Sequence, residues 1–153
     1  VDDLWLASER HARAARFDVA VLLIYRANEA IAQWSLRWDH GIDPGDVPAD
    51  SPIAELASQN HAGKRVLGQH VAWQALGQLG GPLAEVARAT ARSRLDLAQR
   101  RNGSILAHGT TPLTAEDHAR VRDWFAEAVS PAFVAAAFRK GARAPQLPDA
   151  LPA

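Results

Sequence analysis

Apolar residues recur at three- and four-residue steps along most of the chain, the spacing that lets a helix bury one face. The clearest run extends from Asp18 to Trp38, where Asp18 is expected to cap the helix and Gly41 to end it. A first helix is predicted over residues 3–16, with Trp5 on its apolar side and arginines on the other. The N-terminal third is therefore predicted to be helical.

Further helices are separated by residues that favour turns. A Gly-, Pro- and Asp-rich stretch over 40–52 predicts a loop, and Thr114 is expected to cap a last long helix, which Ser130-Pro131 should kink or split. No segment alternates as a strand would, so strands are not expected. The fold class is all-α, a bundle of four to five main helices. The remaining helices are predicted over about 52–60, 64–79 and 82–101, the domain over 1–140, and a loose Pro-rich tail over 141–153.

Composition narrows the function. The chain has 17 basic and 17 acidic residues, so any RNA must bind through a local basic cluster. The absence of cysteine removes disulfides, thiolate catalysis and cysteine-ligated zinc, and the 6 histidines show no metal-ligand spacing. We expect no metal or other cofactor. The longest apolar run, Val19 to Tyr25, is too short to cross a bilayer, and no secretory signal is present, so a cytoplasmic location without membrane contact is expected.

One segment, RRNGSILAHG, gathers chemistry at a predicted helix end. It contains Arg100, Arg101, Asn102 and His108. Histidine can carry the proton steps when an RNA 2′-hydroxyl attacks its own phosphate, and arginine can hold phosphate oxygens and offset the developing charge. Arg101 is the expected phosphate ligand, His108 the general acid or base or the group that orients the 2′-hydroxyl, and Asn102 a positioning residue.

The spacing of Arg and His alone is weak evidence, because such pairs arise by chance. Arg65 and His70 form a second match, within the helix predicted over 64–79, and are read as a surface or packing pair. Glu116 and Asp117 fall in the first turn of the last predicted helix, where acids favour the helix dipole, and are read as structural.

The surroundings of Arg101 separate the two matches. RNGSILAHG resembles the signature of HEPN ribonucleases attached to type III CRISPR systems, in which an Arg followed by a polar residue precedes a His. The segment RFDVAVLLIYRANEAIAQWSLRWDHGID, residues 16–43, resembles an early helix of the same family, whose characteristic run is here Tyr25-Arg26-Ala27-Asn28-Glu29. The two stretches occur in the family's order and together cover about a quarter of the chain.

The resemblance implies a helical domain that forms homodimers and cleaves single-stranded RNA in a cleft shared by two protomers. It also implies that cleavage needs no metal and leaves a 2′,3′-cyclic phosphate. In the CRISPR branch an N-terminal CARF domain binds cyclic oligoadenylate and activates the nuclease. This sequence shows no such strand-rich region and contains no methionine, so we expect the nuclease part of a longer chain. The alternative is a stand-alone HEPN toxin.

Supporting roles remain open between two interpretations. Arg26 and Glu29 are expected to point toward the cleft, with Glu29 holding Arg101, or else to form an ordinary intrahelical pair. Arg100 either contacts RNA phosphate or is a solvated helix-end arginine. The five tryptophans are expected in the core or at a dimer interface rather than stacked on bases. Two other functions remain, a non-catalytic dimerisation or scaffold module and, with no recognition-helix pattern to favour it, a helical DNA-binding domain.

Overall fold

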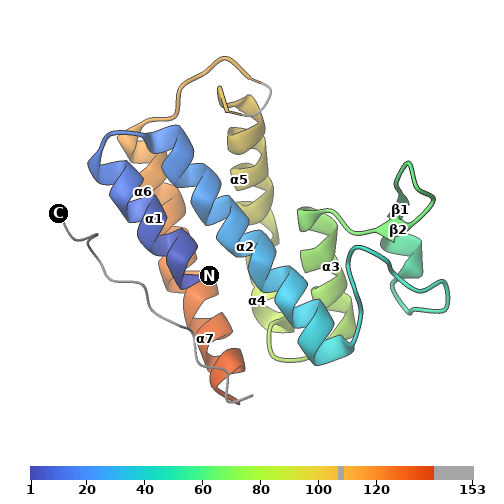
Figure 1. The fold of residues 1–153 in the computed structure, drawn as a ribbon. Coiled ribbons are helices and arrows are strands. Elements are labelled where there is room, and N and C mark those ends of the chain that lie inside the picture. Colours follow the sequence, from blue (N-terminus) through green and yellow to red (C-terminus); the bar gives the residue numbers. More distant parts are fainter. Residues whose placement is uncertain (107–108, 140–153) are drawn as a thin grey trace. The chain divides into compact units, whose positions relative to one another are not determined.

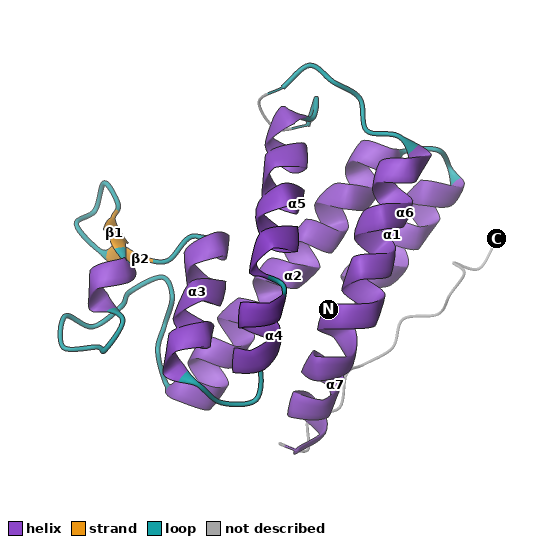
Figure 2. Cartoon of the chain, turned by 180° about the vertical axis from the view of Figure 1, so that it is seen from behind, coloured by secondary structure: helices purple, strands orange, loops and turns teal. Residues whose placement is uncertain are grey.

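The computed structural model describes residues 1–106 and 109–139, and helix dominates that range (Figure 2). Thr90 alone separates α4 from α5, and a π-helical segment joins α6 to α7, so the described residues form five main helical stretches, as predicted. The predicted tail lies outside these residues. The elements are α1 (Asp2–Arg13), α2 (Phe17–His40), the 3-10 helix η1 (Ala54–Leu56), β1 (Ser58–Gln59), β2 (Arg65–Val66), α3 (Gln69–Leu79), α4 (Ala84–Ala89), α5 (Ala91–Gly103), α6 (Ala115–Trp124), the π-helix η2 (Phe125–Val129) and α7 (Ser130–Arg139).

The chain divides into two compact units. The first unit comprises Val1–Asn28 and Leu97–Ala153, and the second comprises Glu29–Asp96. The boundaries fall inside α2 and inside α5. Within the first unit, α1 and α6 run side by side (Figure 1).

The core of the first unit follows the apolar stripe seen in the sequence. Ala20, Val21, Ile24 and Ala27 of α2 are buried at helical spacing. Phe125 is 1% exposed, and the Trp5 ring stacks on it with centroids 5.6 Å apart. Burying a side chain of this size stabilises the fold by roughly 1.5–3 kcal/mol. The aromatic pair thus fixes α1 against the segment that follows α6.

The second unit is centred on Trp73 of α3, which is fully buried. The guanidinium of Arg94, 2% exposed, lies over the Trp73 ring at 4.6 Å from its centroid. Arg94 donates hydrogen bonds to the Thr90 hydroxyl and to the Ala87 carbonyl, at the C-terminal end of α4. Burial lowers the pKa of Arg94 to about 10. Its charge meets carbonyls at a helix C-terminus, where a cation is favoured.

Several helix ends lie where turn residues predicted them. Gly41 has φ of 67°, and Ile42 N–H donates to the Leu36 carbonyl across it, which ends α2 in a left-handed cap. Gly80 and Gly81 also have positive φ and end α3. Thr114 caps α6 through a reciprocal pair of hydrogen bonds with Asp117. Ser130-Pro131 coincides with the change from the π-helical segment to α7.

Other expectations were wrong. The helix predicted over 52–60 is one 3-10 turn followed by β1, and the helix predicted from residue 64 begins at Gln69. Strands were not expected, yet β1 and β2 pair antiparallel, with Ser58 opposite Val66. The reason is a tight turn: the Asn60 side chain accepts hydrogen bonds from the backbone of Ala62 and Lys64 and folds the chain back.

Two helix boundaries also differ from the prediction. Asp18 is in the first turn of α2 rather than at its cap, and its carboxylate accepts a hydrogen bond from the Leu113 amide. The helix predicted over 82–101 breaks at Thr90, whose hydroxyl donates to the Val86 carbonyl.

Among the described helices none is both long and apolar enough to span a membrane.

Candidate active site

Arg101 lies in the last turn of α5 and is held from two sides. Its Nη1 donates a 3.0 Å hydrogen bond to the side-chain amide oxygen Oδ1 of Asn102, and its guanidinium carbon lies 5.2 Å from the centre of the Tyr25 ring on α2. A cation over an aromatic face is attracted by the ring quadrupole. The Nε atom is buried and has no hydrogen-bond partner among the described residues. The guanidinium is therefore oriented while part of its donor fork stays unused.

The segment after α5 folds back onto the end of that helix. Ser104 donates through its amide and its hydroxyl to the Arg101 carbonyl, at 3.1 and 2.8 Å. The Gly109 amide donates to the Ser104 carbonyl at 3.0 Å, and the Thr111 amide donates to the Gly103 carbonyl at 3.3 Å. Ser104 and Thr111 form a parallel bridge. Both flanks of residues 107–108 are thus attached to the end of α5, whereas His108 itself lies outside the described residues.

Gly109 is the residue that this return requires. A Cβ atom on Gly109 would overlap the backbone carbonyl of Gly103, so no larger residue fits without moving one of the two backbones. Gly103, by contrast, has open space where a Cβ would lie. Ile105 and Leu106, at the start of the loop, are 53% and 49% exposed.

Arg100 connects the end of α5 to the start of α6. Its Nη1 lies 2.5 Å from Asp117 Oδ1, and the other Asp117 oxygen accepts hydrogen bonds from the amide and hydroxyl of Thr114. Burial acts to raise the pKa of Asp117, but the Thr114 hydrogen bonds and the charges of Arg100 and Arg120 outweigh it and leave the pKa below its usual value. Asp117 thus has the structural role expected of a helix-start acid.

The other supporting residues lie in different units. Arg26 is exposed on α2 in the first unit, and Glu29 is half-buried in the second. The predicted pairing of Glu29 with Arg101 stays a prediction, as does the contact of Arg100 with RNA. Sequence reasoning placed Tyr25 in the apolar run of the second predicted helix and missed its place beneath Arg101. Its position just before Arg26, in the run that resembles the family, was the available signal.

The second Arg–His match has a different setting. Arg65 is half-buried in β2, and His70 is exposed near the start of α3. The sequence predicted both residues within one helix, and that prediction was wrong. Their interpretation as a surface or packing pair stays a prediction, and the two residues provide an internal control outside the RRNGSILAHG segment.

A buried polar cluster joins α1 and α6 in the same unit. Ser8 donates to the Ala20 carbonyl at 2.9 Å and lies 3.3 Å from His118 Nε2, and Glu9 Oε1 lies 4.0 Å from the same nitrogen. A serine nucleophile needs its histidine base oriented by an acid on the opposite ring nitrogen. Since Ser8 and Glu9 both approach Nε2, this cluster lacks that arrangement. No group of three or more His, Asp or Glu side chains in the described part of the chain could hold a metal ion.

Comparison with known families adds an independent observation. A family model described as the Csm6 HEPN domain matches residues 1–130, a range that contains Tyr25, Arg101 and His108. No curated protein and no solved structure gives a significant match.

Proposed function

This chain belongs to the Csm6 HEPN domain family, and we propose that it is a metal-independent endoribonuclease of a type III CRISPR defence system. Its substrate is single-stranded RNA, which it cuts at a site shared by two copies of the chain. The observation that carries the proposal is the set of contacts that orient Arg101, together with the return of the following loop onto the same helix end. A domain used only for scaffolding has no need of an oriented arginine with unused donors.

In the proposed reaction the 2′-oxygen of a ribose attacks the adjacent phosphorus. The O2′–P bond forms and the P–O5′ bond breaks, which leaves a 2′,3′-cyclic phosphate and a free 5′-hydroxyl. The 2′-oxygen loses a proton and the departing 5′-oxygen gains one. Arg101 binds the phosphate oxygens and offsets the charge that builds up on them. His108 carries one of the proton steps or orients the 2′-hydroxyl, and Asn102 keeps the Arg101 guanidinium in place.

The reaction has two proton-transfer steps, which two histidines can share. A dimer supplies two histidines, because each protomer contributes its own His108. The exposed apolar pair Ile105 and Leu106 lies two positions before His108 in the chain, as expected for residues covered by a second protomer. We propose a homodimer on this ground. We further propose that a sensor domain that binds cyclic oligoadenylate, where one is joined to this domain, controls how the two motifs meet.

The proposal is tested by cleavage of a fluorescent single-stranded RNA in EDTA. The parent chain is compared with Arg101→Ala and His108→Ala, and the products are tested for a cyclic phosphate. The chain supplies a matched control in the second Arg–His pair, Arg65→Ala with His70→Ala. We expect cleavage by the parent and the control, and a loss of at least a hundredfold in the two motif variants, as removal of a charge-stabilising or proton-transferring group typically causes.

Equal cleavage by all four proteins would show that the activity comes from another site or a contaminant, and would overturn the assignment. Absence of cleavage by the parent, at protein concentrations where it is dimeric, would favour the scaffold function instead. Cleavage that disappears in EDTA and returns with a divalent cation would contradict the metal-independent mechanism.

A further inference from the structure

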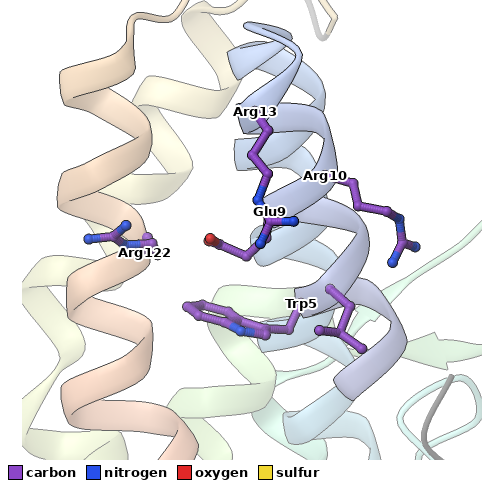
Figure 3. Close-up of a pocket in the computed structure, with 6 residues that line it drawn as sticks. Trp5, Glu9, Arg10, Arg13 and Arg122 are labelled. Atoms are coloured by element: carbon purple, nitrogen blue, oxygen red, sulfur yellow. The ribbon is translucent and has the colours of Figure 1, made fainter. Parts of the chain in front are cut away.

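Three arginines line a groove at the surface of α1 and α6 in the first unit, with Arg10 extending on the side of α1 away from Arg122 (Figure 3). The groove has a volume of about 410 Å³ and is lined by Trp5, Leu6, Glu9, Arg10, Arg13 and Arg122 (Figure 3). That volume is within the roughly 300–1,000 Å³ of small-molecule sites. In a chain without net charge, such a gathering of arginines is a local basic cluster of the kind that RNA binding requires.

The acidic side chains near the groove do not cancel the positive charge of its arginines. Glu9 reaches from α1 toward α6 in Figure 3, and its Oε1 is buried 4.0 Å from His118 Nε2. One of its two carboxylate oxygens is thus turned toward His118, and the groove has three arginines against one acid in its lining. Arg122 is paired with the neighbouring Asp123 at 2.7 Å. The guanidinium groups of Arg10 and Arg13 form no hydrogen bond or ion pair with the described side chains.

A flat apolar surface accompanies these charges. Trp5 lines the groove, and its ring is fixed by stacking on Phe125 with an interplanar angle of 19°. A fixed indole is a platform on which a nucleobase can stack, and arginine binds phosphate through its planar fork. Dipole stabilisation at the end of α1 would account for two arginines there, but not for their association with a groove and an aromatic wall.

We propose that this groove binds one nucleoside phosphate unit of single-stranded RNA, with Arg10 and Arg13 on the phosphate and Trp5 against the base. The groove is separate from the Arg101 motif and holds the strand without cutting it. The idea rests on the proposed function for the identity of its ligand. Free nucleotide shares the same chemistry, so the experiment must separate the two sources.

The test measures binding of a fluorescent RNA that carries 2′-O-methyl groups and so cannot be cleaved, by anisotropy across a range of salt concentrations. Parent is compared with the double variant Arg10→Ala/Arg13→Ala. Arg16→Ala is the matched control, because Arg16 is exposed near the same end of α1 but does not line the groove. We expect the slope of log affinity against log salt to fall by about 0.7 for each lost phosphate contact in the double variant, and to be unchanged in the control.

An equal loss of RNA affinity in Arg16→Ala and in a single Arg13→Ala variant would show a general effect of positive charge and would overturn the groove proposal. So would unchanged binding in the double variant, or no binding by the parent. Displacement of the RNA by uridine monophosphate at concentrations equal to the dissociation constant of the RNA itself would identify free nucleotide rather than the strand as the ligand. Binding is measured on RNA that cannot be cleaved. Failure of the groove proposal can therefore be distinguished from failure of the nuclease proposal. If binding depends on the groove arginines but the parent cleaves no RNA, only the nuclease proposal is overturned. If the parent cleaves RNA but the double variant binds it as the parent does, only the groove proposal is overturned.

Discussion

The guanidinium carbon of Arg101 lies 5.2 Å from the centre of the Tyr25 ring, which brings the end of α5 onto α2 in the first unit. Two stretches far apart in the sequence meet through this contact. The ring limits the directions available to the guanidinium, and Asn102 holds one of its nitrogens. An arginine held in this way loses less side-chain entropy when it binds a phosphate.

Removing the Tyr25 ring should slow RNA cleavage. A cation over an aromatic ring contributes roughly 0.5–2 kcal/mol, which corresponds to about a 2- to 30-fold loss of rate for Tyr25→Leu. Tyr25→Phe keeps the ring and should retain most of the activity. Single-turnover cleavage at saturating protein measures the effect. Identical rates for the Leu and Phe variants would show that the ring does not orient Arg101.

Gly109→Ala should abolish most cleavage, because its Cβ would overlap the Gly103 carbonyl and displace the loop that carries His108. We expect a loss of more than about tenfold, since misplacing a reacting group by an ångström is costly. Gly103→Ala is the matched control, because open space surrounds the position of its Cβ. Both variants are compared with the parent in the cleavage assay and by circular dichroism. Full activity of Gly109→Ala would show that the loop does not need this close approach.

Asp117→Asn should destabilise the protein at neutral pH by about 1–2 kcal/mol, through loss of a helix cap and of the ion pair with Arg100. The pKa of Asp117 is lowered in the folded protein. Its contribution is therefore complete above the unfolded pKa, 3.8, and is lost as pH falls through the folded value.

Urea unfolding at pH 7 and near pH 2.5 measures this difference, and the gap between parent and Asp117→Asn should shrink at the lower pH. Glu116→Gln is the control, because that side chain is 82% exposed and pairs only with Arg120 among the described side chains. A gap that is independent of pH would contradict the assigned role of the charge.

His118 should make the fold less stable in mild acid. Burial lowers its pKa from 6.5, and the charge of Arg122 acts in the same direction, against the opposing effects of Glu9 and Asp123. The stabilisation is thus complete above pH 6.5 and is lost as pH falls below that value, because the unfolded chain binds the proton more tightly.

The check is the urea midpoint at pH 7.5 and pH 5.5 for the parent and His118→Gln. The variant should lose part of the pH dependence, whereas His61→Gln, at an exposed position, should retain it. If His118→Gln and the parent keep the same dependence, another group is responsible for it.

Local patterns in the sequence were sufficient for the long α2 helix and for several helix ends, because helical periodicity and caps depend on residues close together in the chain. The α2 stripe, the left-handed cap at Gly41 and the capping box at Thr114 all follow from neighbours within a few positions. The hairpin of β1 and β2 could not be predicted in this way, because its strands are only two residues long and depend on the Asn60 turn. Such short strands carry no periodicity to detect.

The sequence by itself placed Arg101, Asn102 and His108 close together in the chain and predicted a helix end at Arg101, and motif resemblance indicated their chemistry. Only the tertiary structure decided which distant groups lie beside Arg100 and Arg101. It placed Tyr25 beneath Arg101, assigned Arg100 to Asp117, and gathered the arginines of α1 and α6 around Trp5. The physical reason is that these contacts join residues distant in the chain. They depend on how helices pack, whereas the spacing of residues along one helix records only its own neighbours.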